Sequence, residues 1–161
     1  MISGSQLPAP DSRLPVFSWP TRVYWEDTDA GGVVYHARYV AFLERARTEW
    51  LRWRGQGQEE LRNRHDLVFA VRAMQLDFLR PARLDDLLVV TAGLQACKRA
   101  SMVFAQSIVC GDEVLLTAQV RVAALSAGSF RPKPLPDALY EELKALEVPC
   151  NHQPAVTNKE T

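Results

Sequence analysis

Cysteine is scarce in this 161-residue sequence, and the three cysteines lie far apart at Cys97, Cys110 and Cys150. They form no CxxC pair, and no histidine stands at ligand spacing from them. An odd, widely spaced set favours neither a disulfide framework nor a zinc site. We therefore expect no metal, and a reduced cytoplasmic compartment is the simplest environment for the chain.

Long apolar runs and an excess of one charge are also missing. No stretch approaches the roughly 18 consecutive apolar residues of a membrane-spanning helix, and the N-terminal "MISGSQLPAPDSRLP" lacks a basic region followed by an apolar one. We expect neither secretion nor a membrane span. The 19 Lys and Arg residues balance the 19 Asp and Glu residues. This balance removes the electrostatic signature of a general nucleic-acid binder.

Enough apolar sequence is present for one folded domain, since 47% of the residues are hydrophobic. Residues 1–16 combine prolines with serines, and residues 149–161 are polar. Both ends are predicted to be flexible segments. Residues 17–148 are predicted to form the single domain.

The patterning of that domain predicts an α+β fold with one long helix and an antiparallel sheet of about five strands. Apolar residues recur at steps of three and four from Ala37 to Trp53, and Trp50 and Trp53 belong to this apolar face and are expected to be buried. A short helical turn over 59–64 and a final amphipathic segment around Leu139 and Leu143 complete the helices. Strands are predicted over 21–27, 67–79, 86–97, 101–110 and 113–125.

The junction before the long helix, "YWEDTDAGGVVYHARY", concentrates the residues that could carry chemistry. Adjacent glycines allow a sharp turn, and the first amides of a helix have no internal partners. The N–H of His36 could therefore donate to a carbonyl oxygen that becomes an oxyanion, while Asp29 attacks the carbonyl or activates water. The alternative is ordinary loop chemistry, because Asp before Gly-Gly favours a turn and Asp or Thr can cap a helix.

The segment "RVYWEDTDAGGVVYHARYVAFLERARTEWLR" closely resembles the signature of hotdog-fold acyl-CoA thioesterases. The similarity is to the 4-hydroxybenzoyl-CoA thioesterase family, in its Tol-Pal-associated branch. It continues through "FAVRAMQLDFLRPARLDD" and "KRASMVFAQSIV", over residues 18–136. The resemblance implies a hotdog fold, in which the sheet wraps a long central helix. It also implies protomers paired edge to edge, as a homodimer or homotetramer with sites at the interface.

The same resemblance assigns roles within the junction. The family's catalytic carboxylate matches Asp29, as nucleophile or general base. Its oxyanion donor matches the backbone N–H of His36, whose imidazole could also contact substrate or water. Tyr24, Asp27 and Gly32 match the rest of the motif and would orient the loop or line the pocket. The alternative for Tyr24 and Asp27 is a strand residue and a turn carboxylate.

A rival catalytic acid is Glu44, eight residues after His36. A sibling group of hotdog thioesterases uses a helix glutamate at about this spacing in place of the loop aspartate. The structural alternative is that Glu44 pairs with Arg47 or Thr48 on its own helix. The intact aspartate motif favours this alternative.

Basic residues outside the junction are candidates for binding the phosphates of coenzyme A. Lys98 and Arg99 match a basic turn that contacts the nucleotide end in relatives, although the next position is Ala100 here. Arg131 and Lys133 lie in "SFRPKPLP" near the end of the domain. The alternative for each of the four is a solvated surface position.

These residues together predict a cytoplasmic acyl-CoA thioesterase without a metal or other cofactor, coenzyme A being part of its substrate. Short-chain or aromatic acyl groups are expected first. An acyl carrier protein as the carrier of the acyl group is one alternative. A non-catalytic module that binds acyl thioesters or the cell-envelope machinery is another. A hotdog hydratase or dehydratase is disfavoured by the intact "DTDAGG".

Overall fold

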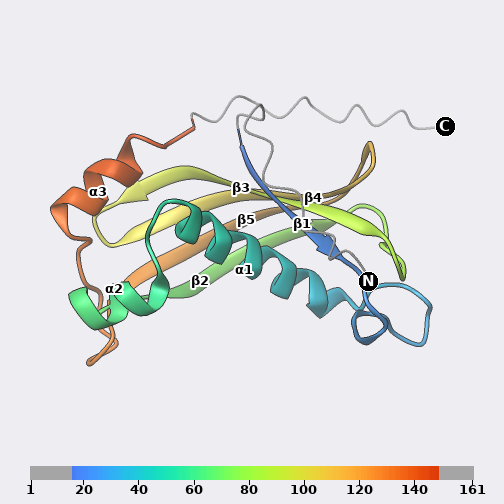
Figure 1. Ribbon diagram of the computed structural model, residues 1–161, viewed down its shortest axis with the longest axis horizontal. Helices are drawn as coiled ribbons and strands as arrows, with labels where there is room; N and C mark the ends of the chain where they lie inside the picture. Colours follow the sequence, from blue (N-terminus) through green and yellow to red (C-terminus); the bar gives the residue numbers. More distant parts are fainter. Residues whose placement is uncertain (1–15, 149–161) are drawn as a thin grey trace, which may run out of the picture.

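The computed structural model describes residues 16–148, so the expected flexible ends, 1–16 and 149–161, lie outside the described residues except for Val16. One five-stranded antiparallel sheet has the order β1-β3-β4-β5-β2, and α1 crosses it lengthwise (Figure 1). The strands are β1 (Phe17–Arg22), β2 (Leu67–Phe78), β3 (Leu87–Lys98), β4 (Ser101–Cys110) and β5 (Glu113–Ser126). The helices are α1 (His36–Trp53), α2 (Gln58–His65) and α3 (Asp137–Lys144), with a 3-10 turn, η1, over Trp25–Asp27.

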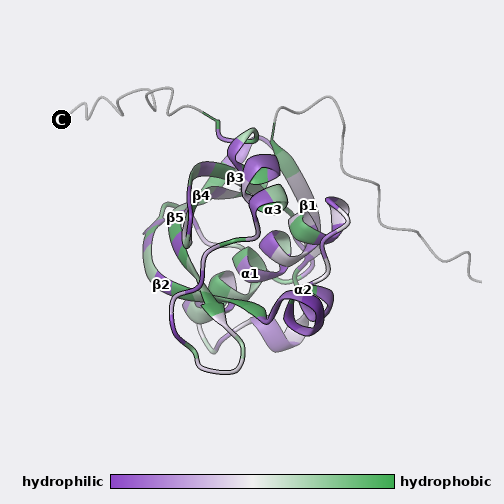
Figure 2. Cartoon of the chain, turned by 90° about the vertical axis from the view of Figure 1, so that its left-hand side faces the viewer, coloured by the Kyte–Doolittle hydropathy of each residue, from purple (hydrophilic) through white to green (hydrophobic). Residues whose placement is uncertain are grey.

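The strands curve around α1, which lies inside the arc when the molecule is viewed from one end (Figure 2). The 18 residues of α1 span about 27 Å at 1.5 Å per residue. Its face toward the sheet is fully buried at Phe42, Leu43 and Ala46. The predicted α+β class and the helix wrapped by an antiparallel sheet are confirmed.

The start of α1 is held in an apolar cluster of its own, separate from the cluster at its end. Tyr39, Phe42 and Leu43 of the helix pack there with buried side chains of β3, β4 and β5. Val34 and Ala82, from two loops, belong to the same cluster. Full burial of a large apolar side chain contributes about 1.5–3 kcal/mol, so several of them fix the helix start firmly against the sheet.

The strand predicted over 21–27 was wrong, because β1 ends at Arg22 and Trp25–Asp27 is a 3-10 turn. The aromatic content that suggested a strand is on the surface, where Tyr24 is 63% and Trp25 81% exposed. The Asp27 carboxylate accepts the Tyr24 N–H at 2.9 Å and so turns the chain away from the sheet. Pro20 lies within β1, which is tolerated because β1 is an edge strand.

The expectation that both tryptophans of α1 are buried was right for Trp50 and wrong for Trp53. Trp50 is 3% exposed, whereas Trp53 is 58% exposed. Trp53 is the last residue of the helix, and its ring packs against Phe17 and beneath the guanidinium of Arg54, at 5.6 and 4.7 Å. The helical periodicity could not show that the helix ends at Trp53, where one side of the ring is left open.

The two edges of the sheet differ in length and in cover. At one edge, β1 pairs with the first half of β3. The end of the domain covers the strand further along, where the Val148 N–H donates to the Leu94 carbonyl at 2.9 Å. The 12-residue strand β2 forms the other edge, with no further strand beside it in the described part of the chain. Val71 and Phe78 on this strand are about half exposed. A long open edge of this kind is suited to pairing with another chain.

No helix between residues 16 and 148 has both the length and the apolar character needed to cross a lipid bilayer.

Candidate active site at the start of the long helix

A tight loop joins η1 to α1, and it is closed by its own backbone. The Asp29 N–H donates to the Val33 carbonyl at 2.9 Å, and the Gly32 N–H donates to the Asp29 carbonyl at 3.0 Å. Gly32 has a φ of +76°, in the left-handed region that a side chain disfavours. The predicted sharp turn is therefore present, and it requires glycine at position 32.

The Asp29 carboxylate is folded back over this loop. Its Oδ1 accepts the Gly31 N–H at 2.8 Å, and a Cβ on Gly31 would lie only 3.0 Å from that oxygen. Its Oδ2 has no partner among the described residues, and the side chain is exposed. Asp29 thus makes the turn contact of ordinary loop chemistry and still presents one free oxygen to a substrate.

The backbone donors that open α1 lie a few residues further along. The helix begins at His36, and the Tyr35 side chain makes no capping hydrogen bond. Across residues 16–148, no backbone hydrogen bond outside the helices uses the N–H of His36 or Ala37. Such amides carry the positive end of the helix dipole and are suited to an oxyanion. The exposed His36 imidazole lies 4.5 Å from the Tyr35 ring.

Asp27 clamps the two sides of this loop together. Its side chain is buried, and its Oδ1 accepts from Nε and Nη2 of Arg38 at 2.9 and 2.8 Å. Its backbone carbonyl accepts the Tyr35 N–H at 2.9 Å. Of the two roles expected for Asp27, the contacts are those of orienting the loop, because both carboxylate oxygens already have protein partners.

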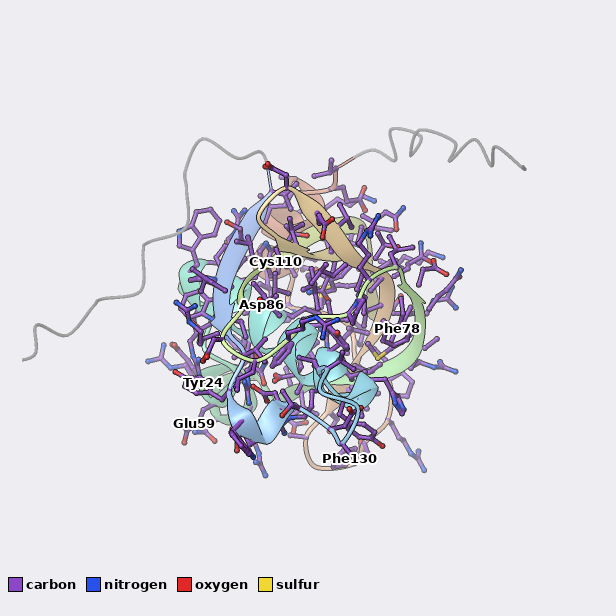
Figure 3. All side chains as sticks on the ribbon, turned by 90° about the vertical axis from the view of Figure 1, so that its right-hand side faces the viewer. Tyr24, Glu59, Phe78, Asp86, Cys110 and Phe130 are labelled. Atoms are coloured by element: carbon purple, nitrogen blue, oxygen red, sulfur yellow. The ribbon has the colours of Figure 1, made fainter. Side chains whose placement is uncertain are left out.

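Arg38 was missed from the sequence, although a signal for it exists. It lies in the first turn of α1, where a cation is disfavoured by the helix dipole. A basic residue in that position suggests a carboxylate partner, and the buried Asp27 is that partner. Tyr24 contributes its backbone N–H to the clamp, while its ring points outward on the β1 side of this end (Figure 3).

Glu44 does not approach the loop within one chain. It lies two turns into α1, about 12 Å along the axis from His36. Its Oε1 accepts the Thr48 hydroxyl at 2.6 Å, and the Gln58 amide donates to that hydroxyl at 2.8 Å. The pairing with Thr48 is thus present, and it links α1 to α2.

The basic candidates lie at the opposite end of the molecule, where the β3–β4 turn meets α3 (Figure 1). Arg99 pairs with Asp137 at 2.7 Å, and its guanidinium lies 4.1 Å from the centre of the Tyr140 ring. Lys98 is exposed, and its side chain has no hydrogen bond or ion pair within the described chain. One chain therefore does not bring these residues to Asp29.

The other two basic residues have different surroundings. Lys133 donates to the backbone carbonyls of His65 and Asp66, at 2.5 and 3.4 Å, where it caps the end of α2. Arg131 is exposed, and its backbone carbonyl accepts the Ser126 N–H at 2.9 Å. Lys133 is therefore largely occupied by structural contacts, whereas the Arg131 side chain is on the surface.

A depression of about 540 Å³ lies on the sheet, away from this loop. Small and polar residues line it, among them Thr91, Gly93, Ala105, Ser107 and Thr117, and none of its lining residues comes from the Asp29 loop. Nor does any trio of His, Cys, Asp or Glu side chains in residues 16–148 form a metal-binding group. The Asp29 loop and the first turn of α1 therefore form a candidate site separate from this depression.

Comparison with known proteins identifies the family of the chain. The family model described as "Thioesterase superfamily" matches residues 31–117. The sequence is 45% identical over 130 residues to "Acyl-CoA thioester hydrolase YbgC" of Escherichia coli O157:H7, which covers 80% of this chain and 96% of that protein. It is 44% identical over 129 residues to "Acyl-CoA thioesterase YbgC" of Haemophilus influenzae, covering 80% of this chain and 92% of that one.

A solved structure gives the same picture for the fold. The crystal structure of a probable thioesterase from Bartonella henselae superposes with a TM-score of 0.72 at 38% identity, over 75% of this chain and 99% of that one. The thioesterase structure of Bartonella henselae and the relatives above confirm the hotdog thioesterase resemblance drawn from the sequence.

Proposed function

The chain belongs to the thioesterase superfamily, and we propose that it hydrolyses an acyl-CoA thioester with the Asp29 carboxylate and the backbone N–H of His36. One observation carries the residue assignment. A free carboxylate oxygen and an uncapped helix start lie on the same tight loop. The printed activity of the relatives at 45% and 44% identity supports acyl-CoA as the substrate class.

The thioester carbonyl would lie with its oxygen at the N–H of His36. In the general-base route, Asp29 takes a proton from water as the water oxygen bonds to the carbonyl carbon. The carbonyl oxygen becomes negative and is held by the helix N–H. The C–S bond then breaks, and the proton on Asp29 passes to the departing thiolate. Free acid and free thiol are the products.

In the nucleophilic route, an Asp29 oxygen bonds to the carbonyl carbon itself and thiolate leaves, giving an anhydride. Water then cleaves the anhydride and restores the carboxylate. Both routes use the same two protein groups, and the free Oδ2 of Asp29 is available for either. A well-placed oxyanion donor lowers the barrier by about 2.7–4 kcal/mol in such reactions.

A partner subunit would complete the site. Antiparallel pairing of β2 with the same strand of a second chain, about a two-fold axis, places the second chain in the reverse direction. The β3–β4 turn of one chain, with its basic residues, would then lie at the end of the molecule that carries the Asp29 loop of the other. The open edge of β2, with half-exposed Val71 and Phe78, supports this homodimer. Packing of two such dimers about a second two-fold axis would give the homotetramer.

Short-chain or aromatic acyl groups remain our expectation for the acyl part, and the cytoplasm for the compartment. Acyl carrier protein is the alternative carrier. It shares the chemistry and would need a protein-sized docking surface. A binding role in the Tol-Pal envelope machinery is the alternative from another class, and it does not require the Asp29 carboxylate.

The test is thiol release from short, long and aromatic acyl-CoAs by purified wild type and Asp29→Asn. Asparagine keeps an oxygen that can accept the Gly31 N–H, so the turn is preserved while the charge is lost. We expect kcat to fall by orders of magnitude. Asp112→Asn, in the exposed β4–β5 turn, is the matched control and should retain wild-type activity.

Full activity of Asp29→Asn would show that Asp29 only shapes the loop, and Glu44→Gln would then be the variant to assay. If wild type releases no thiol from any acyl-CoA, acyl carrier protein substrates are tested next. Inactivity toward these as well would leave the binding role. Light scattering of wild type and Val71→Lys tests the β2 pairing, since a charge on that edge should favour the monomer.

A further inference from the structure

Ala82, in the loop that follows β2, hydrogen-bonds to the segment between the Asp29 loop and α1. Ala82 is fully buried, and its carbonyl accepts the Val34 N–H at 2.9 Å. Its own N–H donates to the hydroxyl oxygen of Tyr39 at 2.9 Å. Val34 lies two residues before the start of α1, and Tyr39 lies in its first turn. One residue therefore holds both sides of the helix start.

Tyr39 is firmly placed for this contact. It is 4% exposed, and its ring packs edge-on against Phe42 and Phe78, with centroids 6.2 and 5.8 Å away. Figure 3 shows Phe78 on the β2 side of this end of the molecule. Burial raises the pKa of the Tyr39 phenol, and the charges of Asp86 and Asp29 add to the rise, so the hydroxyl keeps its proton at neutral pH.

Ring packing alone would be provided equally well by phenylalanine. The hydroxyl has a separate role, because without it the buried N–H of Ala82 would lose its acceptor. The loop of Ala82 could relieve that loss only by moving, and Val34 is hydrogen-bonded to the same residue. The next N–H, that of Tyr35, donates to the Asp27 carbonyl, and the one after it is that of His36 at the start of α1, so a shift at Val34 is passed over two residues to the N–H of His36.

We propose that Tyr39 is a positioning residue of the active site: its hydroxyl, through Ala82 and Val34, sets the position of the His36 N–H. The proposal rests on the proposed function, because it assigns Tyr39 to the same oxyanion donor. Tyr39 touches no substrate in this role. Catalysis depends steeply on such placement, and a displacement of about 1 Å can cost about 10²-fold in rate.

The test is Tyr39→Phe, which keeps the ring and removes the one oxygen. We expect kcat to fall by about tenfold or more while KM changes less than about threefold, since the donor acts mainly in the transition state. The shape of the pH–rate profile should not change, because Tyr39 exchanges no proton with substrate. Tyr140→Phe, which removes a hydroxyl from α3 at the other end, should leave kcat unchanged.

Hydrogen exchange gives a readout that does not depend on activity. The amides of Val34 and Ala82 should be protected in wild type and should exchange at least about tenfold faster in Tyr39→Phe, as expected when local opening becomes easier. Phe104→Leu is the packing control, since Phe104 is buried against Trp50 in the core cluster at the far end of α1 and not at the helix start. It should lower Tm and leave kcat close to wild type.

Two outcomes would overturn the proposal. One is an unchanged kcat in Tyr39→Phe, and a lower Tm beside it would make Tyr39 an ordinary core residue. The other is unchanged protection of Val34, which would break the link through Ala82 even if kcat fell. A wild type that is inactive on every thioester would refute the proposed function, and the exchange measurement would still decide the link.

Discussion

The two ends of α1 use their polar groups in different ways. At the far end, near α2 and α3, Arg99 pairs with Asp137 and Lys133 caps α2, while Lys98 is exposed and has no side-chain partner in the described chain. At the near end, Asp27 and Arg38 are paired in the same manner, but Asp29 keeps a free oxygen and the helix start is uncapped. Open polar groups within an otherwise satisfied frame therefore mark the candidate site more specifically than charge does.

The largest expected effect comes from removing the open donor itself. His36→Pro deletes one N–H. Proline is tolerated at the first position of a helix, and the extended backbone of Tyr35 is compatible with a proline after it. We expect kcat to fall about 10²–10³-fold, equivalent to about 2.7–4 kcal/mol, in steady-state thiol release. His36→Ala keeps the N–H, so its smaller loss of kcat measures what the imidazole contributes to the reaction. Equal activity of His36→Pro and wild type would show that the start of α1 is not the active site.

A second effect tests the paired groups of the near end. Asp27→Ala leaves the partly buried N–H of Tyr24 and the Arg38 guanidinium without their acceptor. We expect a loss of about 1–3 kcal/mol in the free energy of unfolding, measured by urea titration, together with a lower kcat. Glu26→Ala is the control, because Glu26 is an exposed partner of Arg38 at 3.5 Å. An exposed pair contributes at most about 1 kcal/mol. Equal losses in both variants would contradict the clamp.

A smaller effect separates the two residues of the basic turn at the far end. Lys98→Ala should raise KM for acyl-CoA about two- to fivefold at low salt, with little change in Tm, because this side chain is unpaired in the described chain. Arg99→Ala should mainly lower Tm, since Arg99 pairs with Asp137 and stacks on Tyr140. The reverse pattern would mean that Arg99 leaves α3 to bind the substrate.

The smallest effect concerns stability at low pH. Hydrogen bonds from Ser126 and Gly128, and the charge of Lys133, hold the pKa of Asp66 below its ordinary value of 3.8. This stabilisation is complete above the ordinary value and is lost as the pH falls through the lowered one. Wild type should therefore lose Tm more steeply below about pH 4 than Asp66→Asn, in which the left-handed backbone is still tolerated. Parallel Tm curves for the two proteins would contradict the assignment.

The periodic elements were predictable from the sequence because burial imposes their pattern. The long helix was predicted to begin at Ala37 and begins at His36, and four of the five strands were placed within one or two residues. The first strand was misplaced because Tyr24 and Trp25 have the composition of a strand and stand on the surface. One carboxylate, that of Asp27, redirects the chain there, and composition does not report such a contact.

The local part of the candidate site was equally accessible. Asp29, Gly31, Gly32 and His36 are neighbours in the chain, so their spacing already suggested a loop before a helix. The long-range part was not accessible. Ala82 follows β2, more than forty residues after Val34, and only folding brings it to the loop. Nor could the sequence show that Lys133 and Arg99 are already engaged by neighbouring elements.

Gly31 shows how little separates an intact motif from a working site. A methyl group at this position would stand 3.0 Å from the oxygen of Asp29 that closes the loop, and the carboxylate would have to yield. A homologue with alanine there would retain every ionisable group of the motif. A genome annotation that checks only for the aspartate and the histidine would classify that homologue as an enzyme. The informative position in such a comparison is the glycine, where the smallest possible side chain leaves room for the reacting one.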